Sequence, residues 1–258
     1  GPDDLGIWAE GDLALGFARL AINGEGAVGY QPHQHGGLVG AINGEIYNHR
    51  ELRRRYDLVS SECDTDVVLP LLARKGPRSI DELDGFYSAV VLQPRTREAL
   101  CLRDHMGKKP LFVGRSSTEV FITSELKGLD ECEWFELLPR GIAKVDLDTG
   151  AVVRVASHRP VIPETDLATA FERAVQKRMP NSGQPVGVFL SGGLDSSLVA
   201  AFASRLRKDV TYFTLGNTEG PDRQAVEGVV AALGLVDVRT VPLPEPAGFP
   251  ALVREVVR

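Results

Sequence analysis

The sequence is poor in cysteine, has no excess of positive charge and contains no long hydrophobic run. Its three cysteines, Cys63, Cys101 and Cys132, form no C-x-x-C pair, which predicts reduced thiols rather than a disulfide framework. The net charge of −6 provides no basic surface for nucleic acid or an anionic membrane. No apolar run approaches the length of a membrane span, and no signal peptide is visible. We therefore expect a cytoplasmic protein that binds neither nucleic acid nor membrane.

The 258 residues, 43% hydrophobic and 25% charged, have the composition of an ordinary folded protein. This length favours two domains over one. The pattern of apolar residues changes near the proline-rich segment 159–165, which we take as a linker. We therefore expect a first domain at residues 1–158 and a second at residues 166–258.

Short apolar runs of β character dominate the first domain. They predict strands at 13–20, 38–42, 88–92, 99–103, 111–114, 120–124, 142–145 and 152–155. Helices are expected at 48–56 and 64–75, with Asp64 capping the second and Pro70 kinking it. This pattern predicts an α+β domain of antiparallel sheets packed in layers.

Strands and helices alternate in the second domain. A helix capped by Thr165 or Asp166 precedes expected strands at 186–190, 210–215 and 238–241. Helices at 196–206 and 223–233 separate these strands. Such alternation predicts an α/β domain with a parallel sheet, whose ligands bind at the carboxyl ends of the strands.

Residues 191–197 read SGGLDSS and lie between an expected strand and an expected helix. This arrangement directs backbone N–H groups and the positive end of a helix at an anion. The loop has no lysine, so it is not a Walker A loop, and it carries the carboxylate of Asp195. That carboxylate would repel phosphate unless a cation such as Mg²⁺ lay between them. The loop predicts binding of pyrophosphate with Mg²⁺ during reaction at the α-phosphate of ATP; a flexible Gly/Ser linker is the alternative.

The loop resembles that of the ATP pyrophosphatases, which include asparagine, β-lactam, GMP and argininosuccinate synthetases. The motif alone does not choose among them. The resemblance implies an adenine nucleotide α-hydrolase-like fold, with Mg²⁺ held at Asp195 through pyrophosphate. It also implies that ATP and pyrophosphate contact Phe189, Leu190, Ser191, Gly192, Gly193, Asp195, Ser196 and Leu215.

The first domain contains the sequence NGEIYN at 43–48. This sequence resembles the signature of class II glutamine amidotransferases of the asparagine synthetase B type, and the motifs of the domain resemble that family in their order. Further segments that resemble the family lie at 1–6, 17–22, 63–66, 102–111 and 121–127. The resemblance implies an N-terminal-nucleophile glutaminase fold.

The chemistry of five positions fits free glutamine. Arg19 can hold the α-carboxylate with a two-pronged guanidinium, and Glu45 and Asp64 suit the ammonium group. The Asn43 amide and the Gly44 N–H can form an oxyanion hole. Taken singly, Arg19 in a surface ion pair and Asn43-Gly44 in a type I′ turn are better interpretations. The ordered set of motifs favours the glutamine site.

The nucleophile of this family is an N-terminal cysteine whose own amine serves as base. Residue 1 is Gly, and Cys63, near the expected site, has no terminal amine. The second acidic loop and the lysine of the family are also not found in residues 1–258. We therefore expect the sequence to be part of a longer protein at both ends.

The resemblance implies a glutamine-dependent asparagine synthetase, a ligase that uses glutamine, ATP and aspartate or another carboxylate. Ammonia from glutamine would amidate a β-aspartyl-AMP formed from aspartate and ATP. A β-lactam-synthetase-like ligase with a relic glutaminase domain is one alternative, and a truncated non-catalytic homologue is another. An N-terminal cysteine would favour the amidotransferase, and its absence would favour the ligase with a relic glutaminase domain. The protein could also form a homodimer, which the sequence does not decide.

Two further features favour ordinary interpretations. His33 and His35 lie in a polar segment without a third ligand, which favours solvent exposure over a metal site. Residues 53–55 are three arginines, which predict a solvated helix face.

Overall fold

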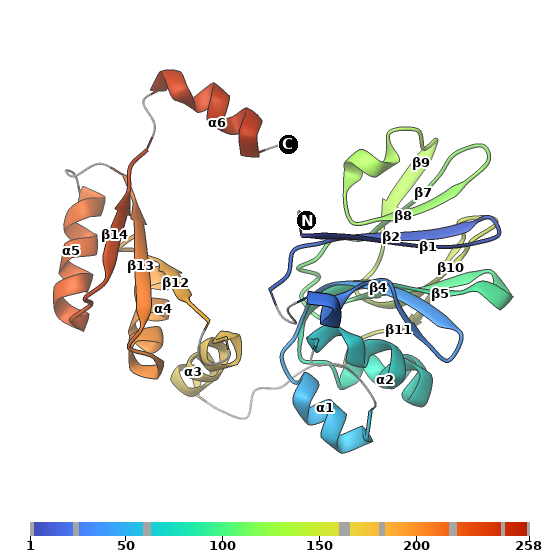
Figure 1. Cartoon of the computed structure of the whole chain (residues 1–258), viewed down its shortest axis with the longest axis horizontal. Helices are drawn as coiled ribbons and strands as arrows, with labels where there is room; N and C mark the ends of the chain where they lie inside the picture. The colour runs from blue at the N-terminus through green and yellow to red at the C-terminus, as the bar shows by residue number, and fades with distance from the viewer. Residues whose placement is uncertain are drawn as a thin grey trace. The chain divides into compact units, whose positions relative to one another are not determined.

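The structure is a computed structural model that describes residues 3–22, 26–58, 63–159, 166–180, 184–216, 221–243 and 246–256. The chain divides into two compact units, Gly1–Val161 and Ile162–Arg258, and each is described by itself (Figure 1). Most of the expected linker, residues 160–165, lies outside the described residues.

A six-stranded antiparallel sheet forms the centre of unit 1. Its strand order is β11-β10-β6-β5-β4-β3. The strands are β3 (His33–His35), β4 (Leu38–Ile46), β5 (Gly85–Gln93), β6 (Glu98–Arg103), β10 (Gly141–Asp146) and β11 (Val152–Ala156). Successive side chains alternate between the two faces of a strand, so each face of this sheet builds a separate core.

Helices cover one face of this sheet (Figure 1). They are α1 (His49–Tyr56), η2 (Asp64–Val67), α2 (Val68–Lys75) and η3 (Gly76–Asp81). Ile42, Ile46 and Tyr87 of the sheet pack here against Leu52 and Leu69 of the helices. All five side chains are at most 1% exposed, which makes this the core that fixes the position of β4.

A second layer of strands covers the other face. It contains the hairpin β1 (Asp4–Glu10) with β2 (Leu13–Arg19) and a sheet of order β8-β7-β9. The latter strands are β8 (Val120–Thr123), β7 (Phe112–Arg115) and β9 (Trp134–Leu137), and short helical turns lie at η1 (Gly26–Gly29), η4 (Pro94–Thr96) and η5 (Leu126–Leu129). Leu15 and Val113 of this layer share a core with Ala41 and Val90 of the large sheet. The predicted α+β architecture of layered antiparallel sheets is confirmed.

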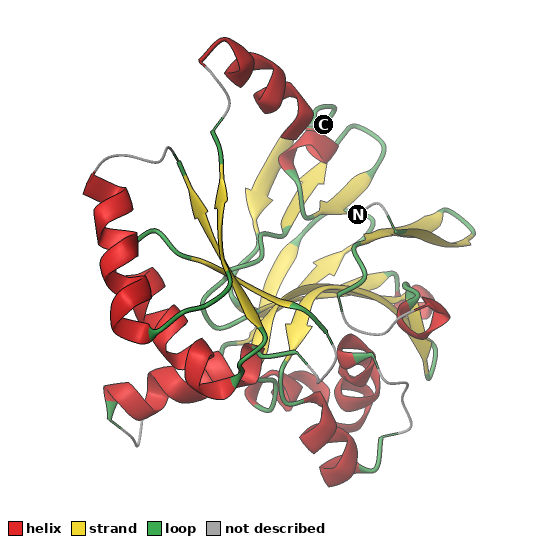
Figure 2. Cartoon of the chain, turned by 60° about the vertical axis from the view of Figure 1, so that its left-hand side comes forward, coloured by secondary structure: helices red, strands yellow, loops and turns green. Residues whose placement is uncertain are grey.

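Unit 2 is an α/β unit with a parallel sheet of order β12-β13-β14. The strands are β12 (Val186–Phe189), β13 (Val210–Leu215) and β14 (Val238–Val241), and the helices are α3 (Leu167–Arg178), α4 (Leu194–Leu206), α5 (Pro221–Leu233), η6 (Pro246–Gly248) and α6 (Phe249–Val256). Helices lie along the sheet in Figure 2, and Val188, Tyr212, Ala200 and Val226 form the core between them. The predicted α/β fold is confirmed. None of the described helices in either unit is long and apolar enough to cross a membrane.

Two predictions about the helix at 64–75 were wrong. Asp64 does not cap it, because a 3-10 turn intervenes and α2 begins at Val68. Pro70 produces no interior kink, because it is the third residue of α2. The N–H groups of the first helical turn have no partner within the helix, so a proline there breaks no hydrogen bond. Strands β1, β3 and β9 were not predicted.

Candidate functional site

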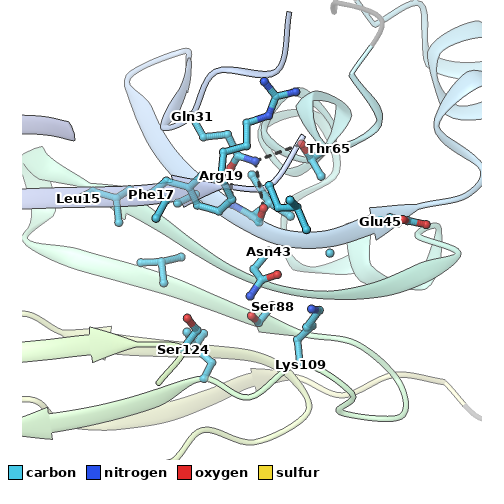
Figure 3. A pocket seen from close by; sticks show the side chains of 18 of the residues that line it. Leu15, Phe17, Arg19, Gln31, Asn43, Glu45, Thr65, Ser88, Lys109 and Ser124 are labelled. Carbon is cyan, nitrogen blue, oxygen red and sulfur yellow. Dashed lines mark hydrogen bonds between the residues drawn. The ribbon is translucent and has the colours of Figure 1, made fainter. Parts of the chain in front are cut away.

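A cavity of about 470 Å³ lies between the two strand layers of unit 1 (Figure 3). Its walls come from β2, β4, β5, the end of β8 and residues 63–65. All five residues expected to bind glutamine line it: Arg19, Asn43, Gly44, Glu45 and Asp64. Sequence positions up to 45 residues apart therefore contribute to one wall.

Asn43 and Gly44 lie inside strand β4, not after a strand as expected from the sequence. The strand continues to Ile46, and Asn43 and Gly44 pair with Ser88 and Tyr87 of β5. The type I′ turn considered for Asn43-Gly44 is therefore wrong. Gly44 has a φ of +150°, and a Cβ there would lie 2.0 Å from the Phe86 carbonyl oxygen. Only glycine fits this approach of two strands.

The Gly44 N–H points to the edge of β4 that faces away from β5. Residues of a strand direct their N–H and C=O groups alternately to the two edges, so Ile42, Gly44 and Ile46 share an edge. The Ile42 N–H donates to Gln31 Oε1 over 2.6 Å, and the Ile46 N–H donates to Asp64 Oδ2 over 2.8 Å. Gly44 lies between these two bonds, so its N–H faces the same edge of β4.

The backbone of Tyr87 supports this orientation. Tyr87 is opposite Gly44 in the register, but its N–H donates to Asp104 Oδ2 over 3.2 Å. Its carbonyl accepts the N–H of Asp104 over 2.9 Å. The Gly44–Tyr87 pair is thus one of the pairs that exchange no hydrogen bonds. The Gly44 N–H and the Asn43 side chain can therefore act together as oxyanion donors.

Asp64 lies on the short η2 turn and is 5% exposed. Burial raises the pKa of this carboxyl group above its ordinary value, while the bond from the Ile46 N–H opposes that shift. Arg53 holds the turn in place through the carbonyl of Cys63 and the carboxylate of Asp66. The Arg53 side chain is only 15% exposed, so the solvated arginine face predicted for α1 was wrong at this position.

Arg19 ends strand β2 with its side chain almost fully buried. Its Nη1 forms an ion pair with Asp4 at 3.2 Å, and this pair is partly buried, with the Asp4 side chain 20% exposed. A Cβ on Gly29 would lie 2.1 Å from Arg19 Nη2, and glycine there gives the guanidinium room. A guanidinium carries five N–H donors, so the ion pair with Asp4 is compatible with binding a second carboxylate.

Sequence reasoning missed several residues of the wall, among them Gln31, Thr65, Ser88, Lys109 and Ser124 (Figure 3). Ser88 is 2% exposed, and the Asn43 side chain points towards it. The strand register alone could have identified Ser88, since it pairs with Asn43. No sequence signal connects Gln31 to the site.

Cys63 also lines the cavity, but its thiol is not activated. The side chain is 4% exposed, and its Sγ lies 3.3 Å from Thr65 Oγ1. Burial raises the pKa of the thiol, which lowers the fraction of reactive thiolate.

The two histidines of β3 differ in their surroundings. His33 is half-buried, and its Nε2 lies 3.3 Å from Thr65 Oγ1, while His35 is exposed. Burial lowers the pKa of His33. Solvent exposure was therefore the wrong prediction for His33. In the described part of the chain, no group of three or more His, Cys, Asp or Glu side chains could hold a metal ion.

In unit 2 the SGGLDSS segment runs directly into α4. Gly193 is the N-cap, so Asp195 and Ser196 belong to the first helical turn rather than to a loop. The hydroxyls of Ser191 and Ser196 are 3.0 Å apart. Gly192 has a φ of +78°, and a Cβ there would lie 2.8 Å from Val226 N. The segment thus presents hydroxyls and a helix N-terminus on a tightly built turn.

The apolar residues expected near ATP have different exposures. Phe189 and Leu215 end strands β12 and β13 and are 78% and 62% exposed. Leu190 is only 1% exposed, and its side chain packs in the core of unit 2. The expected contact of Leu190 with ATP therefore stays a prediction, and it would be made by the main chain.

We compared the chain with protein-family models and with known proteins. Residues 166–257 match the family model for asparagine synthase. The nodule glutamine-hydrolysing asparagine synthetase of Pisum sativum is 36% identical over 92% of this chain and 44% of its own length. That of Asparagus officinalis is 37% identical with the same coverage. The chain thus spans less than half the length of these relatives.

A solved structure of a glutamine phosphoribosylpyrophosphate amidotransferase from B. subtilis has a TM-score of 0.47 to this chain. The two are 17% identical, and the match covers 95% of this chain and 56% of that one.

The family model for the glutamine amidotransferase domain matches residues 1–159, the whole of the described cavity wall included. This match covers more than half of the sequence, and the chain therefore belongs to the glutamine amidotransferase domain family.

Proposed function

We propose that unit 1 binds free glutamine and hydrolyses its side-chain amide as part of a cytoplasmic, glutamine-dependent asparagine synthetase. The observation that carries the proposal is that Arg19, Asn43, Gly44, Glu45 and Asp64 line one cavity. The proposal includes an amidotransferase domain at 1–158, a linker at 159–165 and a synthetase domain from 166 to 258.

Each end of glutamine has a partner in this wall. Arg19 takes the α-carboxylate, and the carboxylates of Glu45 and Asp64 take the α-ammonium. The Asn43 amide and the Gly44 N–H stabilise the oxyanion that forms when the side-chain amide is attacked. Loss of one such donor typically lowers the rate about 10²- to 10³-fold.

The attacking thiol is assigned, as the resemblance implies, to an N-terminal cysteine of the whole protein. Cys63 is a poor candidate, because its thiol is buried and its pKa is raised. Attack at the amide carbon breaks the C–N bond and releases ammonia. Water then cleaves the thioester and releases glutamate.

Unit 2 is proposed to bind ATP at the start of α4. Ser191, Gly192, Gly193 and Ser196 would hold the pyrophosphate portion, and their exposed hydroxyls and the close turn at Gly192 fit such a group. Asp195 would hold Mg²⁺, which supplies positive charge against the leaving pyrophosphate. Adenylation of the aspartate side chain and attack by ammonia would then give asparagine and AMP.

The test compares two nitrogen sources in the whole protein carrying Arg19→Lys. Lysine keeps the charge but loses the two-pronged geometry, so the KM for glutamine should rise about tenfold or more. Synthesis from free ammonia should stay within about twofold, because ammonia bypasses this site. The exposed Arg95→Lys is the matched control. Equal losses of activity with both nitrogen sources would show that Arg19 has a structural role and would refute the proposed glutamine site.

A further inference from the structure

We propose that Gln31 is a positioning residue for the oxyanion hole. Its side chain holds β4 in place at Ile42. Loss of this side chain should therefore slow hydrolysis of the glutamine amide without weakening the binding of glutamine. The inference rests on the proposed glutaminase function of unit 1. It concerns a residue that only the three-dimensional structure brings to the site.

The Gln31 side chain occupies the position of a strand partner beside Ile42. Strand β3 pairs with β4 from His33 opposite Gly40, and Ile42 lies beyond the end of that pairing. There the Gln31 Oε1 accepts the Ile42 N–H over 2.6 Å, and the Gln31 Nε2 donates to the Ile42 carbonyl over 3.0 Å (Figure 3). A side-chain amide carries one acceptor and two donors, so it can satisfy both main-chain groups of a strand residue. Gln31 is 7% exposed, which shields both bonds from water.

The two hydrogen bonds between Gln31 and Ile42, which we call a clamp, act directly on the backbone of Asn43. The carbonyl of Ile42 and the N–H of Asn43 belong to one planar peptide group, so fixing the first orients the second. At the other end, Asp64 Oδ2 fixes the N–H of Ile46 over 2.8 Å. The two clamps enclose residues 43–45, the part of β4 that carries both oxyanion donors. A displacement of about 1 Å in such a site can cost about 10²-fold in rate.

Thr65, itself a residue of the cavity wall, lies between Gln31 and Asp64 in this arrangement. Its Oγ1 lies 3.5 Å from Gln31 Nε2, 3.3 Å from His33 Nε2 and 3.3 Å from Cys63 Sγ. Thr65 is the residue after Asp64 and is itself 4% exposed. A buried polar network of this kind holds its members in one arrangement when each has a partner. Gln31 and Asp64 therefore set the geometry of the hole together.

The kinetic experiment uses Gln31→Met and Gln31→Glu in the whole protein. Gln31→Met fills the same space without either hydrogen bond, and the kcat for glutamate release should fall about 10- to 100-fold. Its KM for glutamine should change less than about threefold, since the groups that bind the two ends of glutamine are untouched. Gln31→Glu keeps an acceptor for the Ile42 N–H, and its kcat should lie between wild type and Gln31→Met. The exposed Gln34→Met is the matched control, and ammonia-dependent synthesis should be unchanged in all three.

Amide hydrogen exchange on the 258-residue chain tests the clamp without catalysis. In Gln31→Met the Ile42 amide should exchange at least about tenfold faster, while the Ile46 amide, held by Asp64, keeps its protection. Unchanged Ile42 exchange overturns the clamp, even in an active enzyme. Faster Ile42 exchange with an unchanged kcat overturns the positioning role, as does a parallel loss of glutamate release and ammonia-dependent synthesis. A wild-type protein that releases no glutamate overturns the proposed function and the role of Gln31 in it.

Discussion

Replacing Gly44 by alanine should destabilise unit 1 as well as damage the oxyanion hole. An ideal Cβ at Gly44 would lie 2.0 Å from the Phe86 carbonyl oxygen and 2.6 Å from Tyr87 Cα. An ordinary carbon–oxygen contact is about 3.3 Å, so β4 and β5 would have to separate by roughly 1 Å at this pair. Both contacts are to backbone, which cannot swing aside as a flexible side chain would.

The size of the effect follows from two costs. Holding a residue with a Cβ at the φ of +150° seen for Gly44 costs about 1–3 kcal/mol. Overpacking between two buried strands adds about 1–3 kcal/mol. The sum, about 2–6 kcal/mol, is a large part of the roughly 5–15 kcal/mol that stabilises a typical protein. For a unit of this size it corresponds to a fall in Tm of about 4–24 °C.

The assay is thermal unfolding of the wild type, Gly44→Ala and Gly16→Ala, followed by circular dichroism. Gly16 is an exposed strand glycine in β2, and its Cβ would meet no heavy atom within 4 Å. Gly16→Ala should therefore melt within about 2 °C of the wild type or slightly above it. If Gly44→Ala melts together with Gly16→Ala, the close approach of β4 and β5 is wrong.

Three further predictions concern the two sites. Burial raises the pKa of Asp64, and only its charged form attracts an ammonium group. On acidification the KM for glutamine should therefore begin to rise at a pH above about 3.9, the ordinary pKa of an aspartate. Asp64→Asn should have a high KM that lacks this pH dependence. Asp195→Asn should abolish ATP–pyrophosphate exchange in the whole protein while glutamate release continues, with the exposed Glu172→Gln as control; normal exchange would refute the assignment of Mg²⁺ to Asp195. Gly192→Ala should also reduce this exchange, because its Cβ would lie 2.8 Å from the Cβ of Ala225 at a φ of +78°; exchange at the wild-type rate would show that the turn tolerates a side chain.

The sequence was sufficient for elements whose apolar pattern decides their structure. Strands β13 and β14 begin and end at the predicted residues, 210–215 and 238–241. Both are short apolar runs in an alternating strand–helix pattern, so burial on the core face and local preference agree. The antiparallel first unit and the parallel second unit were predicted correctly for the same reason.

The sequence was misleading where tertiary contacts override local preference. Asn-Gly is among the strongest turn signals, yet Asn43 and Gly44 continue β4, because β5 pairs with them along their whole length. Asp64 precedes a helix and looks like a cap, but its carboxylate bonds to Ile46 instead. In both cases the residue that forms the hydrogen bond or the strand pair is distant in the sequence, so no local sequence pattern predicts the contact.

The same side chains that complete the edge of β4 also define the candidate oxyanion hole. Beyond the pairing with β3, the N–H groups of Ile42, Gly44 and Ile46 face an edge to which the described residues add no further strand. An open edge of this kind is a liability that proteins cover in some way. Gln31 covers it at Ile42 and Asp64 covers it at Ile46, and Gly44, which lines the cavity, lies between them. A full strand in place of these two side chains would have paired with Gly44 as well, and it would have left no main-chain donor for a substrate.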